Sequence, residues 1–267
     1  MAERESIGLV AGRYKLPFQV LAEIKRKNAK GVVIGLKGEV DPKLADEADV
    51  FREIEVGQIQ QMFNFFQQEN VKEVVMAGKV GKEAVFEGGF DPRFQQLLRG
   101  LPEKNDDALL SAVVQEFEHN GFRVAKQTGY LQDLLAPMGP ILGQVTPEEM
   151  IDLKLGFKMA KASGELDIGQ SVVVKQGVVL AVEAIEGTDE AIIRGGKLGG
   201  PGAVVVKVSK PRQDERFDVP TVGRTTIESM YKVEANVLGL EAGKTLIAER
   251  EEMMDLAEKY HIKIYAL

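Results

Sequence analysis

Apolar runs and amphipathic segments alternate along the first half of the chain. Three short runs have the length and the β-branched content of buried strands, at 7–11, 31–36 and 71–77. Between them, residues 16–28 and 57–69 show helical spacing of apolar positions, and Pro17 suits the first turn of the earlier helix. This order predicts a parallel sheet, because parallel neighbours need a long crossover connection.

A further helix is expected over 105–121, followed by a strand at 122–124. Residues 136–143 then concentrate proline and glycine, a composition typical of a linker. The length of 267 residues suits one large domain or two small ones. We predict two domains joined by a linker, at 1–135, 136–145 and 146–267.

The second domain opens with a capping box at Thr146-Pro147-Glu148-Glu149, from which a helix runs to about 162. Strands are expected at 171–175, 178–183, 203–208, 245–248 and 262–265. Helices are expected from Gly187, over 226–238 and over 250–260, and the glycine-rich residues 195–202 are predicted to form a mobile loop. The fold class is therefore α/β, with a parallel sheet in the first domain and a mixed sheet in a distinct second α/β domain.

The amino-acid composition argues against several classes of protein and of functional site. The formal net charge of −7 argues against a nucleic-acid-binding surface, which is usually basic. The chain has no cysteine, which excludes a disulfide framework, a thiol nucleophile and cysteine-ligated metal sites. His119 and His261 are the two histidines, so a multi-histidine metal site is nearly excluded, and each is interpreted as a surface residue.

The charged N-terminus shows no signal-peptide pattern, and no apolar run approaches the ~20 residues of a membrane helix. We therefore expect a cytoplasmic protein. Peripheral contact with the inner membrane stays open, since hydropathy does not test it. We also expect a homo-oligomer, taken as a dimer.

Ligands of parallel sheets bind at the carboxyl ends of the strands, so two loops stand out. Residues 11–16 precede a helix whose free N–H groups attract anions, and Arg13 and Lys15 add positive charge. The loop lacks the G-x-G-x-x-G spacing of dinucleotide sites, so it is either a nucleotide or phosphate site or an ordinary turn. Lys79, after the third strand, either faces a ligand or is solvated.

Acidic residues cluster at predicted turns. Asp106 and Asp107 stand where a helix begins, and from the residues alone we favour a capping role. Glu183 ends an apolar strand, while Glu186 and Asp189 flank a Gly-Thr turn. Carboxylates placed this closely repel each other unless a cation or a proton lies between them.

Asp218 precedes Val219-Pro220, so its backbone is pushed to an extended form and its carboxylate can project into a cleft. Oxygen ligands of this kind hold magnesium, and neighbouring Lys and Arg residues suit phosphates. The alternative for Asp218 is a salt bridge to Arg216 or Arg224. The residues alone leave both interpretations open.

Motifs in both halves carry a resemblance to a known family. In chain order they are Gly8–Gly12 with Leu16-Pro17, Ala77–Val80, Asp106–Leu110, Asp167–Gln170, Ala181–Asp189, Lys210-Pro211 with Gln213-Asp214, and Arg216–Gly223. Together they resemble the UDP-2,3-diacylglucosamine pyrophosphatases of lipid A biosynthesis, the family called LpxI, along essentially the whole chain. One departure is Gly12-Arg13-Tyr14-Lys15, where the family usually has a run of glycines.

The resemblance implies a Rossmann-like N-terminal domain and a Mg²⁺-dependent hydrolase. Its substrate would be the amphiphilic UDP-2,3-diacylglucosamine, and its products UMP and 2,3-diacylglucosamine 1-phosphate (lipid X). The family's essential aspartate matches Asp218, which would hold Mg²⁺ with Glu186 or Asp189, and Lys210 would join Asp218 and Glu186 in catalysis. The residues that would bind substrate are Gly12, Leu16, Pro17, Lys79, Asp106, Asp107, Gln170 and Thr188.

The sequence leaves two other classes of function open. In a non-catalytic nucleotide-sugar-binding regulatory protein, the same acids would bind a metal-nucleotide without turnover. A nicotinamide-dependent oxidoreductase is disfavoured by the missing glycine fingerprint. It is also disfavoured by Glu39, which only weakly resembles the ribose-binding acid of such enzymes.

Overall fold

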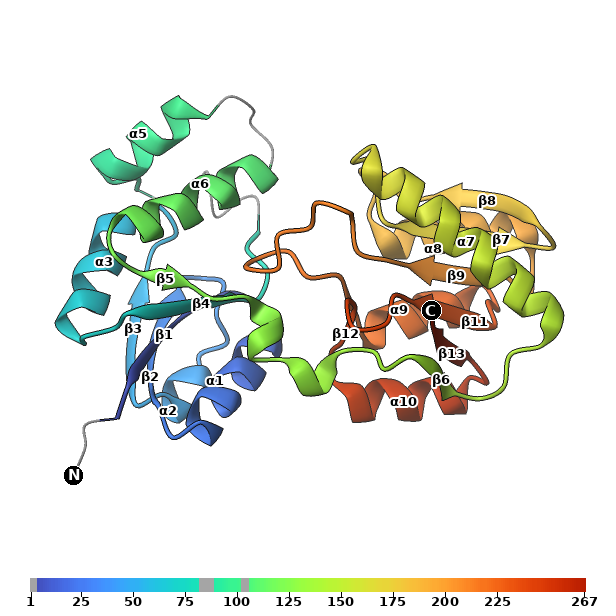
Figure 1. Cartoon of the computed structure of the whole chain (residues 1–267), viewed down its shortest axis with the longest axis horizontal. Coiled ribbons are helices and arrows are strands. Elements are labelled where there is room, and N and C mark those ends of the chain that lie inside the picture. The colour runs from blue at the N-terminus through green and yellow to red at the C-terminus, as the bar shows by residue number, and fades with distance from the viewer. Residues whose placement is uncertain (1–3, 82–88, 102–105) are drawn as a thin grey trace. The chain divides into compact units, whose positions relative to one another are not determined.

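The computed structural model of the protein describes residues 4–81, 89–101 and 106–267, without the side chain of Asp106 (Figure 1). The chain folds into two compact units. The first contains Met1–Leu131 together with Glu215–Phe217, and the second contains Gln132–Asp214 and Asp218–Leu267. Each unit has its own sheet and its own hydrophobic core.

A parallel sheet organises the first unit, as the sequence predicts. Its described strands follow the order β3-β2-β1-β4-β5. They are β1 (Ser6–Ala11), β2 (Lys30–Leu36), β3 (Val50–Ile54), β4 (Glu73–Ala77) and β5 (Arg123–Val124). All four neighbouring pairs are parallel, and Leu9 of β1 lies between Val33 and Val75. The chain reverses its direction of growth between β1 and β4, which makes that point the topological switch of the sheet.

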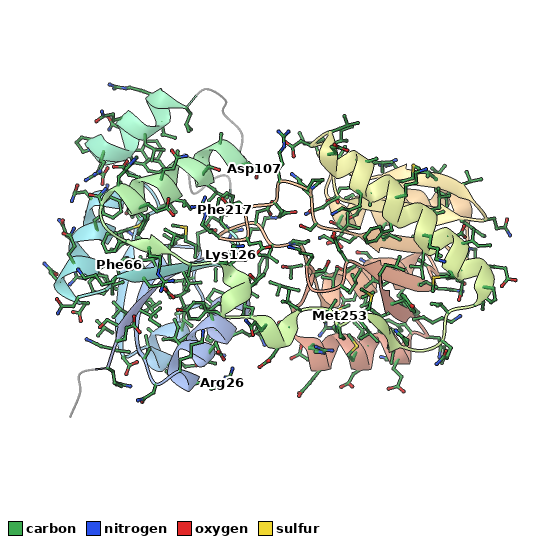
Figure 2. All side chains as sticks on the ribbon, viewed as in Figure 1. Arg26, Phe66, Asp107, Lys126, Phe217 and Met253 are labelled. Atoms are coloured by element: carbon green, nitrogen blue, oxygen red, sulfur yellow. The ribbon has the colours of Figure 1, made fainter. Side chains whose placement is uncertain are left out.

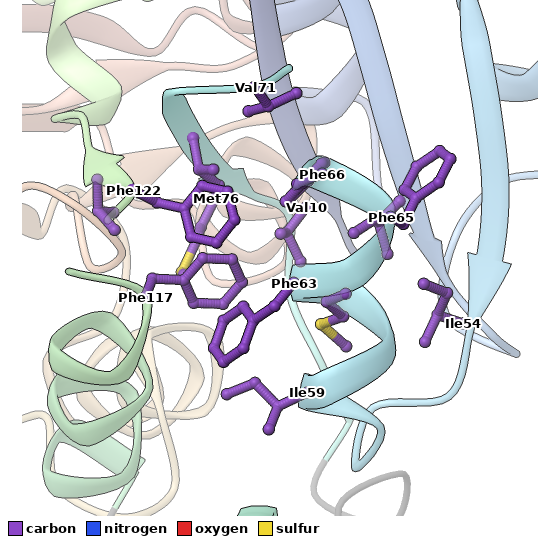
Figure 3. Close-up of a cluster of buried hydrophobic side chains, with 14 of the residues drawn as sticks. Val10, Ile54, Ile59, Phe63, Phe65, Phe66, Val71, Met76, Phe117 and Phe122 are labelled. Carbon is purple, nitrogen blue, oxygen red and sulfur yellow. The ribbon is translucent and has the colours of Figure 1, made fainter. Parts of the chain in front are cut away.

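Helices cover both faces of this sheet. They are α1 (Leu16–Arg26), α2 (Leu44–Glu47), α3 (Ile59–Gln68), α5 (Pro92–Gly100) and α6 (Asp106–His119). On one face, α1 contacts β1, β2 and β4. On the other face, α3 and α6 bury an aromatic cluster in which Phe63 meets Phe117 edge to face at 4.9 Å between ring centroids (Figure 3). Phe217, labelled in Figure 2, packs against the same core.

The sequence pattern missed β3, α2 and α5. Arg52 and Glu53 are exposed on β3, so this edge strand lacks the apolar run that marks its neighbours. Helix α2 is a single turn with only Leu44 buried, which leaves no helical stripe to recognise. Helix α5 carries a short stripe of Phe94, Leu97 and Leu98 on the core, which the sequence-based predictions overlooked.

The second unit is built on a mixed sheet, as the sequence predicts. Its described strands follow the order β6-β13-β11-β9-β7-β8. They are β6 (Gly139–Leu142), β7 (Ser171–Lys175), β8 (Val178–Val182), β9 (Val204–Lys207), β11 (Val237–Leu240) and β13 (Lys263–Ala266). The three central strands are parallel, while β7, β8 and β6 run antiparallel to their neighbours. The short strands β10 (Thr221–Val222) and β12 (Leu246–Ile247) pair separately.

Helices again cover both faces of the second sheet. They are α7 (Pro147–Glu165), α8 (Thr188–Gly199), α9 (Arg224–Lys232) and α10 (Arg250–Lys259). Helix α7 packs on β7, β9 and β11, and its predicted capping box is present between Thr146 and Glu149. The opposite face carries a core that includes Met253 of α10, labelled in Figure 2. Two 3₁₀ turns, at Gln127–Gly129 and Gln132–Leu134, precede this unit's sheet in the chain.

Three sequence predictions for the second half are wrong. Residues 139–142 of the predicted linker form β6, an edge strand paired with β13. The predicted mobile loop is the end of α8, where Cβ atoms at Gly195 and Gly196 would collide with Val173 and Val233. The predicted helix at 226–238 stops at Lys232, because Glu234 takes a left-handed conformation (φ 54°) that turns the chain into β11.

A buried carboxylate fixes the hairpin between β7 and β8, and its loss should destabilise the second unit. Asp152 of α7 is 7% exposed and accepts hydrogen bonds of 2.7 Å from the backbone N–H groups of both Gln176 and Gly177. We expect Asp152→Ala to lower the free energy of unfolding by about 2–3 kcal/mol, because the turn loses two hydrogen bonds to a charged, buried acceptor. Urea unfolding followed by circular dichroism measures the change. The exposed Asp255→Asn should stay within about 0.5 kcal/mol of wild type, and equal losses in both variants would contradict the assignment.

Candidate active site

The register of three strands creates the candidate site in the second unit. Lys207, the last residue of β9, lies opposite Ser171, the first residue of β7. Glu183 directly follows β8, and its backbone N–H donates to the carbonyl oxygen of Ser171 at 2.8 Å. Directly opposed residues on neighbouring strands project to the same face. The ends of β7, β8 and β9 therefore place polar side chains at one edge of the sheet.

Lys207 lies at the centre of this edge. The residue is 9% exposed and follows the fully buried Val204–Val206. Its Nζ donates hydrogen bonds to the hydroxyl oxygen of Thr188, at 3.1 Å, and to the carbonyl oxygen of Thr221, at 2.9 Å. Burial lowers the pKa of the Lys207 side chain, whereas three carboxylates around it act in the opposite direction, those of Glu183, Asp189 and Asp218.

Thr188 connects Lys207 to one of these carboxylates. It is the first residue of α8, and its hydroxyl donates to Glu183 Oε1 at 2.9 Å. The same hydroxyl lies 3.3 Å from Ser171 Oγ. The other carboxylate oxygen of Glu183 accepts a long 3.4 Å hydrogen bond from the backbone N–H of Gln170. Glu183, Thr188 and Gln170 thus form one hydrogen-bonded group with Lys207.

Asp218 lies in the loop between β9 and β10. Gln213 Nε2 donates to Asp218 Oδ2, and Gln213 Oε1 accepts from the backbone N–H of Lys210 at 2.8 Å. The backbone N–H of Asp218 closes a turn by donating to the carbonyl oxygen of Asp214 at 2.9 Å. Val219 and Pro220, which follow Asp218, are buried and anchor this end of the loop. The half-buried carboxylate is therefore fixed from both sides.

The structure brings most of the site residues predicted in the second domain close together. Lys210 Nζ donates to Asp167 Oδ1 at 2.6 Å, in the loop that follows α7. The side-chain Oε1 of Gln170 is buried and accepts no hydrogen bond within the described ranges, so this edge holds one polar atom without a protein partner. Thr188, Asp189 and Asp218 all belong to the surroundings of Lys207.

Glu186 has a different environment. Its carboxylate accepts hydrogen bonds from Arg194 of α8 and, at 3.1 Å, from the backbone N–H of Ala184. The bond from Arg194 is the main cause that holds the pKa of Glu186 below its ordinary value. Glu186 is not among the charged groups that act on Lys207. Its predicted roles as metal ligand and catalytic residue stay predictions, and they would require it to leave Arg194.

In the first unit, Gly12 and Lys79 lie at the topological switch. The backbone N–H of Arg13 donates to the carbonyl oxygen of Lys79 at 2.8 Å, which joins the loops after β1 and β4. A Cβ atom on Gly12 would lie 2.5 Å from that oxygen, so this close approach requires glycine. Leu16 and Pro17 begin α1, with Pro17 in the first turn as predicted.

Glu39 explains how these loops are held. Its side chain is 3% exposed and accepts from Arg13 Nη2 at 2.7 Å and from the backbone N–H of Gly81 at 2.6 Å. The acid after the second strand is therefore engaged within the protein, where a nicotinamide enzyme would use it on ribose hydroxyls. This contact disfavours the oxidoreductase alternative further.

Asp106 and Asp107 both lie at the start of α6, where the sequence predicts a helix. Asp107, labelled in Figure 2, is partly buried. Asn105, which precedes this pair, and the side chain of Asp106 lie outside the described residues. The predicted capping and substrate-binding roles of this pair stay predictions.

Sequence reasoning assigned no role to Lys207, Gln213 or Arg194, although Gln213 belongs to one of the quoted motifs. A signal for Lys207 was available, since a lysine interrupts the apolar run Val204–Val208, and lysine is almost never buried without a partner. The other two residues carry no such signal. Their partners, Asp218 and Glu186, come close only through loop and helix geometry.

The carboxylates around Lys207 suit a magnesium ion. Glu183, Asp189 and Asp218 carry a formal charge of −2 together with one ammonium group. Across the described residues, no three acidic or histidine side chains enclose an ion by themselves. Magnesium fits such an open set, because it usually takes one or two carboxylates and completes its shell with water and phosphate oxygens. Asp189 and Asp218 are the residues that would hold it.

Comparisons with known proteins agree on one family. Residues 6–134 match the LpxI N-terminal domain, and residues 138–265 match the LpxI C-terminal domain. The chain is 32% identical over 266 residues to a protein of Caulobacter vibrioides named UDP-2,3-diacylglucosamine pyrophosphatase LpxI. That alignment covers 94% of both chains.

Solved structures give weaker likenesses. A UDP-glucose-4-epimerase from Stenotrophomonas maltophila is 10% identical, with a TM-score of 0.32, over 45% of this chain and 35% of the epimerase. A leucoanthocyanidin reductase from Vitis vinifera is also 10% identical, with a TM-score of 0.31, over 98% of this chain and 77% of the reductase. In the portion that the structure describes, no helix is both long and apolar enough to cross a bilayer.

The pairing of Glu186 with Arg194 can be tested by titration. We expect Arg194→Ala to raise the pKa of Glu186 towards its ordinary value, because the guanidinium hydrogen bond stabilises the ionised carboxylate. Carbon-13 NMR of the glutamate carboxyl groups measures this. The pKa of Glu148, which its own backbone and Thr146 lower, should not change. An unchanged Glu186 pKa would show that the pair does not persist in solution and would return Glu186 to the candidate metal ligands.

Proposed function

Because the chain belongs to the LpxI family, we propose that it hydrolyses the pyrophosphate bond of UDP-2,3-diacylglucosamine in lipid A biosynthesis. The products would be UMP and 2,3-diacylglucosamine 1-phosphate. The observation that carries the proposal is the group of Glu183, Asp189 and Asp218 around buried Lys207. Pyrophosphate cleavage needs oxygen ligands for a metal ion that are held in position around the reacting phosphates.

We propose Mg²⁺ as the cofactor, held by Asp218 and Asp189. When bound, it would lower the pKa of a water molecule and offset negative charge on the phosphates. Asp218 is suited to the task because Gln213 and the turn from Asp214 fix its carboxylate before any ligand arrives. Asp189 is exposed on the first turn of α8, where it can reach a ligand without a large rearrangement. One of these carboxylates would serve as general base towards the attacking water.

We propose that Lys210 and Lys79 provide positive charge for the phosphates. Lys210 is held by Asp167, and its backbone N–H shares Gln213 with Asp218. Gln170 would accept a hydrogen bond from the sugar or its linkage, because its buried Oε1 has none within the described ranges. Uridine would bind at the switch-point loops of the first unit, near Gly12, Leu16 and Pro17. The open carboxyl edge of a parallel sheet supports that placement.

We propose peripheral contact with the inner membrane, where the acylated substrate would reside. Three large apolar side chains support it, since Leu166, Ile168 and Ile185 are 72%, 52% and 100% exposed. The backbones of their two loops meet closely at Gly169 and Glu183, beside the candidate site. Apolar side chains exposed in this way suit insertion into a bilayer surface. Assembly as a dimer stays a prediction.

Turnover tests the proposed reaction directly. We expect wild-type protein with Mg²⁺ to convert UDP-2,3-diacylglucosamine into UMP and the sugar 1-phosphate, detected by mass spectrometry. EDTA should abolish the products, and Asp218→Asn should lower kcat at least about 10²-fold, because a ligand or base is lost. Asp255→Asn serves as a control with unchanged activity. Substrate that binds but stays intact would favour the regulatory protein instead.

A comparison of two further acids tests the ligand set. We expect Asp189→Asn to lower kcat at least about tenfold, because a proposed metal ligand is lost. Glu186→Gln should change kcat less than about threefold, because Arg194 already engages that side chain. The same steady-state assay at several Mg²⁺ concentrations separates loss of metal affinity from loss of chemistry. The opposite order of the two variants would make Glu186 the ligand.

A further inference from the structure

Lys207 occupies a position where lysine is costly. It ends a central strand whose preceding three residues are fully buried, and it is 9% exposed itself. Moving an ammonium group from water into such surroundings costs several kcal/mol, about what one or two buried leucines contribute. A valine in its place would complete the apolar strand without that cost. The lysine therefore has a role that the stability of the sheet does not explain.

The hydrogen bonds of Lys207 differ from those of two other partly buried lysines in this unit, although Lys175, at the other end of β7, also donates to two backbone carbonyl oxygens. Lys161 donates to both carboxylate oxygens of Glu241, and Lys263 donates to both oxygens of Glu149. These are direct ion pairs. Within the described residues, Lys207 instead donates to two neutral oxygens, the hydroxyl of Thr188 and the carbonyl of Thr221. Lys207 therefore reaches Glu183 through the hydroxyl of Thr188 and not through a direct ion pair.

These two bonds join two segments that are distant in sequence. Thr188 begins α8 and is followed directly by Asp189. Thr221 begins β10, three residues after Asp218, and the buried Val219 and Pro220 connect the two. One ammonium group therefore fixes the start of α8 against the end of the loop that carries Asp218. Asp189 and Asp218 therefore lie in the two segments that this link joins.

We infer that Lys207 is a positioning residue that holds Asp189 and Asp218 at the spacing required for a shared divalent cation. It acts through Thr188 and Thr221 and touches neither the metal nor the substrate. Its charge also offsets repulsion among Glu183 at the end of β8, Asp189 on α8 and Asp218 in the loop after β9. The assignment of the acids to a metal rests on the proposed function. The placement of Lys207 among these acids does not depend on the proposed function.

The experiment uses the absence of cysteine from the chain. Lys207→Met removes the ammonium group and keeps a long side chain. Lys207→Cys introduces a single thiol, which 2-bromoethylamine alkylates in denaturant to restore an ammonium group at nearly the same length before refolding. Lys263→Met is the control, because it removes a strand lysine from a direct ion pair in the same unit. Circular dichroism verifies that each variant is folded.

Three measurements distinguish positioning from a purely structural role. We expect Lys207→Met to lower kcat at least about 10²-fold, because small displacements of catalytic groups are costly. The KM for the UDP-sugar should change less than about threefold, because nucleotide contacts lie elsewhere. Mn²⁺, added alone as an oxygen-binding probe and followed by electron paramagnetic resonance, should bind at least about tenfold more weakly. Alkylated Lys207→Cys should recover both kcat and Mn²⁺ affinity relative to the untreated thiol.

Several results would overturn the inference. Unchanged kcat in Lys207→Met would do so, and so would Mn²⁺ binding that is equal or tighter, as expected if Lys207 only repelled the metal. Equal losses in Lys263→Met would indicate a general stability effect. If Lys207→Met does not fold, Thr188→Val keeps the lysine and removes one of its acceptors, and unchanged Mn²⁺ affinity there would count against the inference.

The two proposals can fail separately. Wild-type protein whose Mn²⁺ affinity depends on Lys207 but which does not cleave the lipid substrate would remove the proposed reaction and leave the positioning role. Cleavage of the lipid substrate that does not depend on Lys207 would support the proposed reaction and overturn the positioning role. Wild-type protein that binds no Mn²⁺ would overturn the positioning role.

Discussion

The burial of one ammonium group at the end of β9 is the constraint on which the candidate site depends. Lys207 reaches that position because β9 is a central strand whose last residue lies opposite Ser171. Once buried, the group needs acceptors and counter-charges, and the surrounding segments provide Thr188, Thr221 and three carboxylates. A buried charge with this many partners is costly to rearrange, so the two segments that Lys207 joins are held together.

Both units use the same physical property of parallel sheets. Loops at the carboxyl ends of parallel strands meet at one edge, where side chains from distant parts of the sequence converge. In the first unit that edge is organised by Glu39, which holds Arg13 and Gly81, and by the contact between Gly12 and Lys79. In the second unit it is organised by Lys207. In each case a buried ionisable side chain ties two loops together.

Most regular elements could be predicted from periodicity, because long apolar runs and a capping box are local signals. The predictions failed where the signal was weak or belonged to the tertiary structure. Strand β3 is half-exposed, β6 consists of residues whose composition resembles a linker, and the glycines of α8 are there for close packing against Val173 and Val233. Similarly, Glu186 and Asp189 look equivalent in sequence, and only the fold pairs one of them with Arg194.

The sequence by itself determined the α/β class, the parallel and mixed sheets, the family and the acidic residues that became candidates. It could do so because hydrophobic periodicity, capping residues and motif order are written along the chain. Only the tertiary structure decided that Lys207 lies among Glu183, Asp189 and Asp218, and that Gln213 holds Asp218. The reason is physical: strand register and loop closure set these distances, and neither is encoded by any short stretch of residues.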